Sequence, residues 1–193
     1  MEPLARRRVP AGSDVETAPI ASGGCLRDAA GCSAPPRVAA VGPPPEQTAR
    51  VVRAVPDFEL AALTGGTVRL YDHVGKDVVL VDFWATYCAP CLVAMPHLEE
   101  LYRRHADEGF VVLGISVDGP ESVGQVRSVV SRLDVTFPIL VDHDSRALSA
   151  YNPRGTAPYS VLIGRDGKVL ARREGYSPGQ VALLDRDVEA ALR

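Results

Sequence analysis

Two cysteines separated by two residues are the most chemically informative feature of this sequence. The β-prone run Val78–Trp84 leads through a short connection into Cys88-Ala89-Pro90-Cys91, at the expected start of a helix. Unpaired N–H groups and a partial positive charge at a helix N-terminus stabilise a thiolate, so we expect the pKa of Cys88 to fall below the ~8.5 of a free cysteine. Cys91, one turn further on, can attack a mixed disulfide formed by Cys88 and release the partner. The spacing therefore predicts thiol–disulfide exchange.

The elements that must position these cysteines follow from the pattern of apolar residues. The run Val78–Trp84 is continuous enough to be a strand covered on both faces, and residues 110–117 repeat that pattern. The spacing of apolar residues predicts helices over 91–108, 121–133 and 178–192. Two hairpins are expected, one with strands at 56–60 and 67–70 and one with strands at 159–163 and 168–173 around Arg165-Asp166-Gly167. Between them we expect a further strand at 137–141 and a short helix at 145–151. This order predicts an α/β sandwich with a mixed central sheet flanked by helices on both faces.

The helix predicted over 91–108 has two distinct sides. Its apolar side holds Leu92, Met95, Leu98, Leu101 and Tyr102, and its opposite, polar side holds Glu99, Glu100, Arg103 and Arg104. We expect the apolar side to be buried and the polar side to face solvent. Pro96 lies inside this helix, where it removes a hydrogen bond and predicts a bend beyond which the helix continues.

Composition excludes several classes of protein. A chain of 193 residues is long enough for one domain and a tail, and 46% apolar residues, 23% charged residues and a net charge of −3 show no bias toward nucleic acid. No stretch approaches the roughly 20 apolar residues of a membrane-spanning helix. Residues 1–50 hold eight of the 16 prolines and no aromatic residue. We therefore predict a disordered Pro/Gly/Ala-rich tail at 1–50 and a folded domain at 51–193.

The residues around the two cysteines resemble a known family. Val-Asp-Phe-Trp-Ala-Thr-Tyr-Cys-Ala-Pro-Cys, at 81–91, is similar to the active-site signature of the thioredoxin superfamily. The upstream Pro-Asp-Phe-Glu-Leu and the downstream Gly-Thr-Ala-Pro-Tyr-Ser-Val-Leu-Ile-Gly-Arg-Asp-Gly resemble its TlpA/ResA-like thiol-disulfide oxidoreductase branch, which is related to the redoxin and AhpC/TSA domains. The resemblance covers residues 51–193. It implies a thioredoxin-like fold with an N-terminal β extension, and it implies no bound cofactor.

The resemblance also implies roles for individual residues. Cys88 is the nucleophile and Cys91 the resolving thiol of a pair that cycles between dithiol and disulfide. Pro158 is the cis-proline whose loop faces the dithiol and pairs with substrate backbone, and Asp82 is the buried acid that relays the Cys91 proton. From the residues themselves, Phe83 and Trp84 are interpreted as packing residues, and Trp84 is also expected to border the reactive thiol and to influence access to it. The predicted substrate-binding residues are Pro158, Ala157, Trp84, Tyr87 and Pro90, and no metal is expected.

Three departures from the family pattern limit this transfer. Tyr87 stands where the family usually has tryptophan, and Ala94 stands where many ResA-like members have a glutamate, three residues after the second cysteine. Residues beside the cis-proline also differ from the commoner ones, namely Ala157, Tyr159 and Ser160. The missing glutamate argues against the specialised cytochrome-maturation chemistry of that branch. General dithiol exchange is unaffected, with Asp82 handling the proton.

Other functions are left open by the residues alone. A peroxiredoxin-like peroxidase shares the scaffold, but Ala85 stands where such enzymes have threonine, three residues before the reactive cysteine. A redox-inactive binding module, such as a metallochaperone or an adaptor, would not need an intact C-x-x-C. A zinc site completed by Cys25 and Cys32 is disfavoured, because their separation is not a knuckle spacing and a C-x-x-C between strand and helix is the redox context. We expect Cys25 and Cys32 to be non-catalytic.

Several other polar residues also have structural interpretations. Asp82 has the alternative role of a buried acid tied to a backbone or hydroxyl partner. Asp142-His143-Asp144 is interpreted as a solvated turn, because three consecutive side chains do not point at one centre. The histidines interpreted as solvated are His73, His97, His105 and His143.

Compartment and partners are predicted only in outline. Arg6-Arg7-Arg8 is not followed by the apolar run of a secretory signal, and residues 20–25 lack the hydrophobic region that precedes a lipoprotein cleavage site. The family resemblance implies an extracytoplasmic protein, periplasmic or membrane-anchored, with a cytoplasmic one as the alternative. We expect a monomeric bacterial enzyme of cell redox homeostasis, with antioxidant activity, that exchanges electrons with protein thiols or disulfides and with an upstream redox partner. Nucleic acid and an integral membrane segment are not expected.

Overall fold

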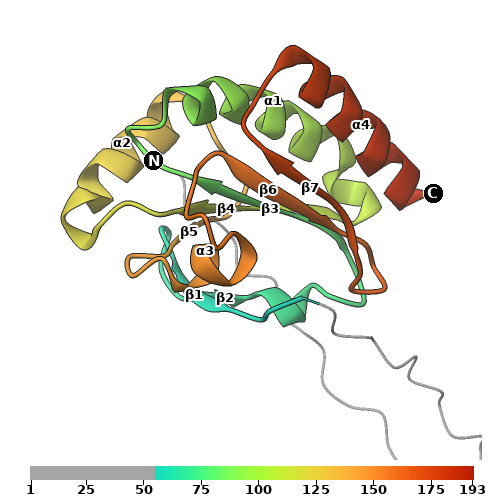
Figure 1. Cartoon of the computed structure of the whole chain (residues 1–193), viewed down its shortest axis with the longest axis horizontal. Helices are drawn as coiled ribbons and strands as arrows, with labels where there is room; N and C mark the ends of the chain where they lie inside the picture. The colour runs from blue at the N-terminus through green and yellow to red at the C-terminus, as the bar shows by residue number, and fades with distance from the viewer. Residues whose placement is uncertain (1–54) are drawn as a thin grey trace, which may run out of the picture. The chain divides into compact units, whose positions relative to one another are not determined.

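The computed structural model describes residues 55–193, so the predicted tail, Cys25 and Cys32 lie outside the described residues. The described residues form one seven-stranded sheet in the order β2-β1-β5-β4-β3-β6-β7 (Figure 1). Its strands are β1 Glu59–Ala62, β2 Thr67–Arg69, β3 Val78–Trp84, β4 Phe110–Ser116, β5 Ile139–Val141, β6 Tyr159–Ile163 and β7 Val169–Glu174.

Three parallel strands form the middle of this sheet. β3 pairs in parallel with β4, and β4 with β5. The flanking strands β6, β7, β1 and β2 all join by antiparallel pairing, which gives the predicted mixed sheet and the β1–β2 extension. Every residue of β3 is buried, as expected for a strand covered on both faces. β3 and β4 end side by side, and both lead from that edge toward helices.

Helices cover both faces of the sheet (Figure 1). They are α1 Ala89–His105, α2 Val123–Arg132, α3 Arg146–Tyr151 and α4 Pro178–Leu192. The inward side chains of α1, α2 and α4 share one buried cluster, which includes Met95, Val126 and Leu184. α3 packs on the other face, where Leu148 and Tyr151 join a second cluster. None of the helices described is both long and apolar enough to cross a bilayer.

The bounds of α1 differ from the prediction in a way that matters for the cysteines. The helix begins at Ala89, so Cys88 is its N-cap residue. It continues through Pro96 to His105, and a 3₁₀ turn over Ala106–Glu108 completes the predicted span. α4 has the predicted bounds.

Both predicted hairpins are present. β1 pairs with β2, and β6 pairs with β7. Gly167 has a φ of 79°, in the left-handed region that favours glycine, and its N–H donates to the carbonyl of Gly164 at 2.9 Å. The turn residues therefore determine where β6 reverses into β7.

The prediction that Glu99 faces solvent is wrong. Its side chain is buried, and it accepts hydrogen bonds from the N–H and the hydroxyl of Thr136 and from Nε of Arg103. Burial alone would raise the pKa of Glu99, but the hydrogen bonds from Thr136, Arg103 and the N–H of Phe137 hold it below its usual value. The partner Thr136 lies 37 residues away, so no pattern within α1 could reveal it.

Two further residues predicted to be solvated are buried. Asp142 has no exposed surface, and it accepts hydrogen bonds from the N–H groups of Ala147 and Leu148 at the start of α3. His105 is 8% exposed, and its Nδ1 lies 2.8 Å from Glu108. Both contacts depend on how the chain turns after a strand or helix, which the run of polar residues does not show.

Candidate active site

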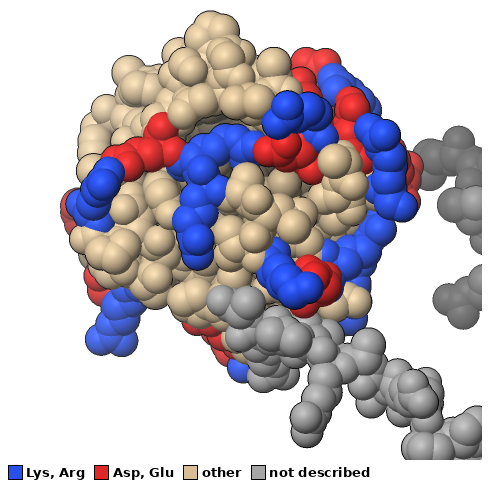
Figure 2. Space-filling view, turned by 45° about the vertical axis from the view of Figure 1, so that its right-hand side comes forward, with Lys and Arg blue, Asp and Glu red and all other residues tan. Residues whose placement is uncertain are grey.

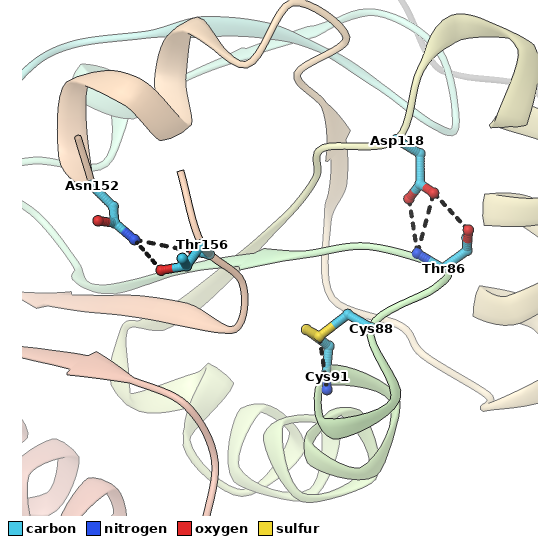
Figure 3. Close-up of a disulfide and its surroundings, with 6 residues drawn as sticks. All are labelled: Thr86, Cys88, Cys91, Asp118, Asn152 and Thr156. Carbon is cyan, nitrogen blue, oxygen red and sulfur yellow. Dashed lines mark hydrogen bonds between the residues drawn. A yellow bond between two sulfur atoms is a disulfide. The ribbon is translucent and has the colours of Figure 1, made fainter. Parts of the chain in front are cut away.

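A disulfide between Cys88 and Cys91 lies at the N-terminus of α1, shortly after β3 (Figure 3). Cys88 is the N-cap residue, and its Sγ accepts a hydrogen bond from the N–H of Cys91 at 3.3 Å. Pro90 occupies the first helical turn, where a missing N–H leaves no hydrogen bond unmade. Cys88 is 8% exposed and Cys91 is 1% exposed, so Cys88 is the more accessible of the two.

Asp118 holds the connection from β3 to α1, although no motif of the sequence indicated this residue. Its buried carboxylate accepts hydrogen bonds from the N–H of Thr86 at 3.0 and 3.2 Å and from the Thr86 hydroxyl at 2.6 Å (Figure 3). The hydroxyl of Ser116 donates a further bond at 2.8 Å. The strand positions could have predicted that Asp118 lies near Thr86. Asp118 follows β4 as Thr86 follows β3, and the carboxyl ends of adjacent parallel strands meet at one edge of the sheet.

The loop at 155–158 contains the predicted cis-proline. The peptide bond between Ala157 and Pro158 is cis. Asn152, the C-cap residue of α3, is buried and donates from Nδ2 to the carbonyl and the hydroxyl of Thr156 at 3.1 and 3.0 Å. Ala157 packs against the cluster that contains both cysteines, and Figure 3 shows Thr156 and Thr86 on opposite sides of the disulfide. Polar anchors therefore hold a loop on each side of the cysteines.

Asp82 lies on β3 and is 7% exposed. It lines a pocket with Ala94, Pro158 and Ser160, and the volume of about 20 Å³ has room for a single water molecule. Burial raises the pKa of Asp82 from 3.8 to about 7. An acid with this pKa takes up and releases a proton near neutral pH. Since Ala94 stands where glutamate is common, α1 adds no carboxylate at this position of the pocket wall.

The sequence pattern of the AhpC/TSA family matches residues 51–172. The chain belongs to the AhpC/TSA family. Thiol-disulfide oxidoreductase ResA of Geobacillus kaustophilus is 39% identical over 125 residues, which are 64% of this chain and 70% of that protein. A Chlorobium tepidum protein described as a candidate thiol:disulfide interchange protein DsbE matches with a TM-score of 0.66 at 31% identity, over 72% of this chain and 95% of that one. A secreted Mycobacterium tuberculosis disulfide oxidoreductase has the same fold, with a TM-score of 0.59 at 23% identity, over 69% of this chain and 95% of that one.

The relatives of this AhpC/TSA protein and its own disulfide agree on the chemistry. The protein is a thiol-disulfide oxidoreductase with a thioredoxin-like fold. This confirms the prediction made from the C-x-x-C and its resemblance to ResA-like proteins.

The remaining residues predicted for the site of this AhpC/TSA protein differ in exposure. Tyr87 is 79% exposed and Pro90 is exposed, so both are accessible to a partner. Trp84 has no exposed surface and packs in the same buried cluster as both cysteines. This burial agrees with the interpretation of Trp84 as a packing residue, and its role in binding substrate stays a prediction. Its predicted place beside the cysteines is consistent with that cluster.

The surface around the disulfide carries little formal charge. Residues 83–98 contain no Lys, Arg, Asp or Glu, and neither do residues 175–184. Figure 2 shows a broad area without charged side chains at the top of the molecule, where Figure 1 places the start of α1 and the turn into α4. Tyr87 and Val93, in the first segment, are 79% and 67% exposed and are the most exposed large apolar residues in the described part of the chain.

Proposed function

We propose that this protein exchanges disulfides with protein partners through Cys88, with Cys91 as the resolving thiol. In the reducing direction, the Cys88 thiolate attacks one sulfur of a partner disulfide, and the other partner sulfur leaves as a thiolate. Cys91 then loses its proton and attacks the Cys88 sulfur, which forms the Cys88–Cys91 bond and releases the second partner thiolate. The partner gains two electrons, and the oxidising direction is the reverse. The disulfide at the N-terminus of α1, with Cys88 more accessible, carries this proposal.

The position of Cys88 favours its thiolate form. Its Sγ lies 3.3 Å from the N–H of Cys91, at the N-terminus of a 17-residue helix. Both that N–H and the helix dipole stabilise negative charge. We therefore expect Cys88 to react faster than Cys91 with small electrophiles in the reduced protein.

Asp82 is the acceptor for the Cys91 proton in this proposal. With a pKa of about 7, a substantial part of Asp82 is ionised at neutral pH and can take up that proton. The pocket beside it has room for one water that relays the proton. Burial is the only influence on its pKa from residues 55–193, which argues against the alternative of an acid tied to a structural hydrogen-bond partner.

A protein partner would dock on the uncharged surface around the disulfide. Tyr87 and Pro90 are exposed there, and the loop before Pro158 offers backbone for pairing with an extended segment of the partner. Every group in this scheme comes from one chain, which supports a monomer. The family resemblance and the secreted protein with the same fold support a location outside the cytoplasm.

A redox titration tests the mechanism and the direction together. The purified chain is equilibrated in glutathione and dithiothreitol buffers, alkylated, and mapped at each cysteine. We expect a two-electron transition that links Cys88 to Cys91. A potential near or below about −250 mV would identify a reductant, and one near about −150 mV an oxidant of folding proteins. Oxidation of Cys88 alone, by peroxide and without a link to Cys91, would replace the dithiol mechanism with the peroxidase alternative.

Two matched cysteine variants assign the roles. Cys91→Ser leaves the nucleophile without its resolving thiol, so we expect it to accumulate mixed disulfides with partner proteins on non-reducing gels. Cys88→Ser should form none above background. Equal trapping by both variants would contradict the assigned order of attack.

A further inference from the structure

Asp118 contacts the turn that presents Cys88. It is 3% exposed and follows β4 at the edge of the sheet where β3 leads toward α1. Its carboxylate accepts hydrogen bonds from the N–H of Thr86 at 3.0 Å, from the Thr86 hydroxyl at 2.6 Å and from the Ser116 hydroxyl at 2.8 Å. Both donors of Thr86 are therefore directed at one carboxylate.

The turn that contains Thr86 is short and closed. The N–H of Cys88 donates to the carbonyl of Ala85 at 3.1 Å, and the N–H of Val117 donates to the carbonyl of Trp84 at 2.9 Å. These bonds attach the two ends of the turn, whereas Thr86 in its middle is attached through Asp118. Without this carboxylate, the middle of the turn loses both anchors.

We propose that Asp118 is a positioning residue for thiol–disulfide exchange. By holding Thr86, it keeps the turn from Ala85 to Cys88 in the geometry that places Sγ of Cys88 against the N–H of Cys91. An N-cap side chain reaches its N–H donors only from an extended backbone, and Cys88 has such a backbone, with φ −89° and ψ 91°. A turn free to rotate at Thr86 would lose that alignment and the stabilisation of the thiolate. The inference rests on the proposed role of Cys88 as the nucleophile.

A carboxylate close to this turn also acts through its charge, and the two effects have opposite signs. A negative charge disfavours a thiolate, so its removal alone would make Cys88 more reactive, whereas lost positioning makes Cys88 less reactive. Asp118→Asn separates them. Asparagine keeps the size and one acceptor oxygen, and its amide group can donate to whichever one of the Thr86 and Ser116 hydroxyls faces it.

The test measures the rate at which iodoacetamide alkylates Cys88 in the reduced full chain at pH 6, with each cysteine followed by peptide mapping. We expect Asp118→Ala to slow the reaction about tenfold, which corresponds to a rise of about one in the pKa of the thiol. Thr86→Val, which keeps the shape and loses the hydroxyl, should slow it about threefold. Thr86→Ser and Asp118→Asn should stay within about twofold of the wild type, because both retain hydrogen bonding.

Asp142→Ala is the matched control. Asp142 is also a fully buried acid that accepts two N–H bonds, but these come from the start of α3. We expect a lower Tm for this variant with no change in the alkylation of Cys88. If Asp118→Ala resembles it, with a lower Tm and an unchanged rate, the positioning role is overturned. Faster alkylation in Asp118→Asn, by fivefold or more, would overturn it in favour of charge.

Two further outcomes concern an Asp118→Ala variant that does not fold and a wild type in which Cys88 is not the more reactive thiol. If Asp118→Ala does not fold, the contrast between Thr86→Val and Thr86→Ser carries the test, and equal rates in these two variants would overturn the proposal. If Cys88 of the wild type reacts no faster than Cys91, the proposed function itself fails, and that result is independent of every Asp118 variant.

Discussion

Two buried aspartates of this protein differ in the hydrogen-bond donors that surround them. Asp82 on β3 is 7% exposed, and burial alone raises its pKa to about 7. Asp118, just after the neighbouring strand β4, is 3% exposed and accepts hydrogen bonds from three donors of Thr86 and Ser116. The two side chains are thus buried to a similar extent, whereas the number of hydrogen-bond donors around them differs.

The donors decide what each acid can do. A buried carboxyl without donors exchanges its proton near neutral pH, which suits the acceptor of the Cys91 proton. A buried carboxylate surrounded by donors is oriented, which suits an anchor for the turn before Cys88. The two acids would therefore serve different cysteines, Asp82 by titrating and Asp118 by holding its neighbours in place.

Asp82→Asn should slow thiol–disulfide exchange more than the other substitutions discussed below. We expect resolution of the mixed disulfide by Cys91 to slow about 100-fold at pH 7, because the proton acceptor is lost. The lifetime of the mixed disulfide after rapid mixing measures this step. The inflection near pH 7 in its pH profile should disappear. An unchanged profile would remove Asp82 from the mechanism and end the contrast between the two acids.

The same variant has a thermodynamic readout. Since the pKa of Asp82 is about 7 in the folded protein against a usual 3.8, the folded state keeps a proton between these values that the unfolded chain has released. Stability therefore falls as the pH rises through this window, by up to ~4 kcal/mol, and Asp82→Asn should not show this fall. Urea unfolding at pH 5 and pH 8 compares the two proteins. Equal pH dependence would contradict the raised pKa.

Glu99→Gln changes a third buried carboxylate, on the same helix as the cysteines. Glu99 joins α1 to Thr136, away from the active-site turn. We expect a loss of about 1–3 kcal/mol in the free energy of unfolding, with an unchanged redox potential. Because the pKa of Glu99 lies below its usual value of 4.5, its stabilisation should be lost only as the pH falls below that value. A changed potential would mean that any buried acid near α1 tunes the cysteines.

The smallest effect is expected at the surface. Tyr87→Ala removes a 79% exposed side chain next to Cys88 and should raise KM for a protein disulfide about threefold, with little change in kcat. The rate with a small disulfide should stay the same, because no docking surface is involved. A loss of rate with both substrates would place Tyr87 in the chemistry.

Local features of this protein were predictable. The positions of β3 and α4, both hairpins and the C-x-x-C at a helix start depend on residues close to one another in sequence. Patterns with a period of two or 3.6 residues, and glycine in a tight turn, report directly on local backbone geometry. The family resemblance added the cis peptide before Pro158, which the structure contains.

Residues with distant partners were not predictable in the same way. The polar side of α1 gave no sign that Glu99 binds Thr136. Asp142 was expected in a solvated turn, but it caps α3 from a fully buried position. In both cases the residue type is polar, and a polar side chain can be exposed or can be buried with hydrogen-bond partners.

The chemistry of this protein follows from its sequence, since two thiols one helical turn apart at a helix N-terminus have few other uses. The order of strands and helices also follows from the sequence, because these elements depend on local periodicity. The different surroundings of the two aspartates arise only in the folded chain, where Asp82 is buried and Asp118 meets donors of Thr86 and Ser116. The energy of a buried charge depends on the donors around it, and those donors come from segments that meet only when the chain folds.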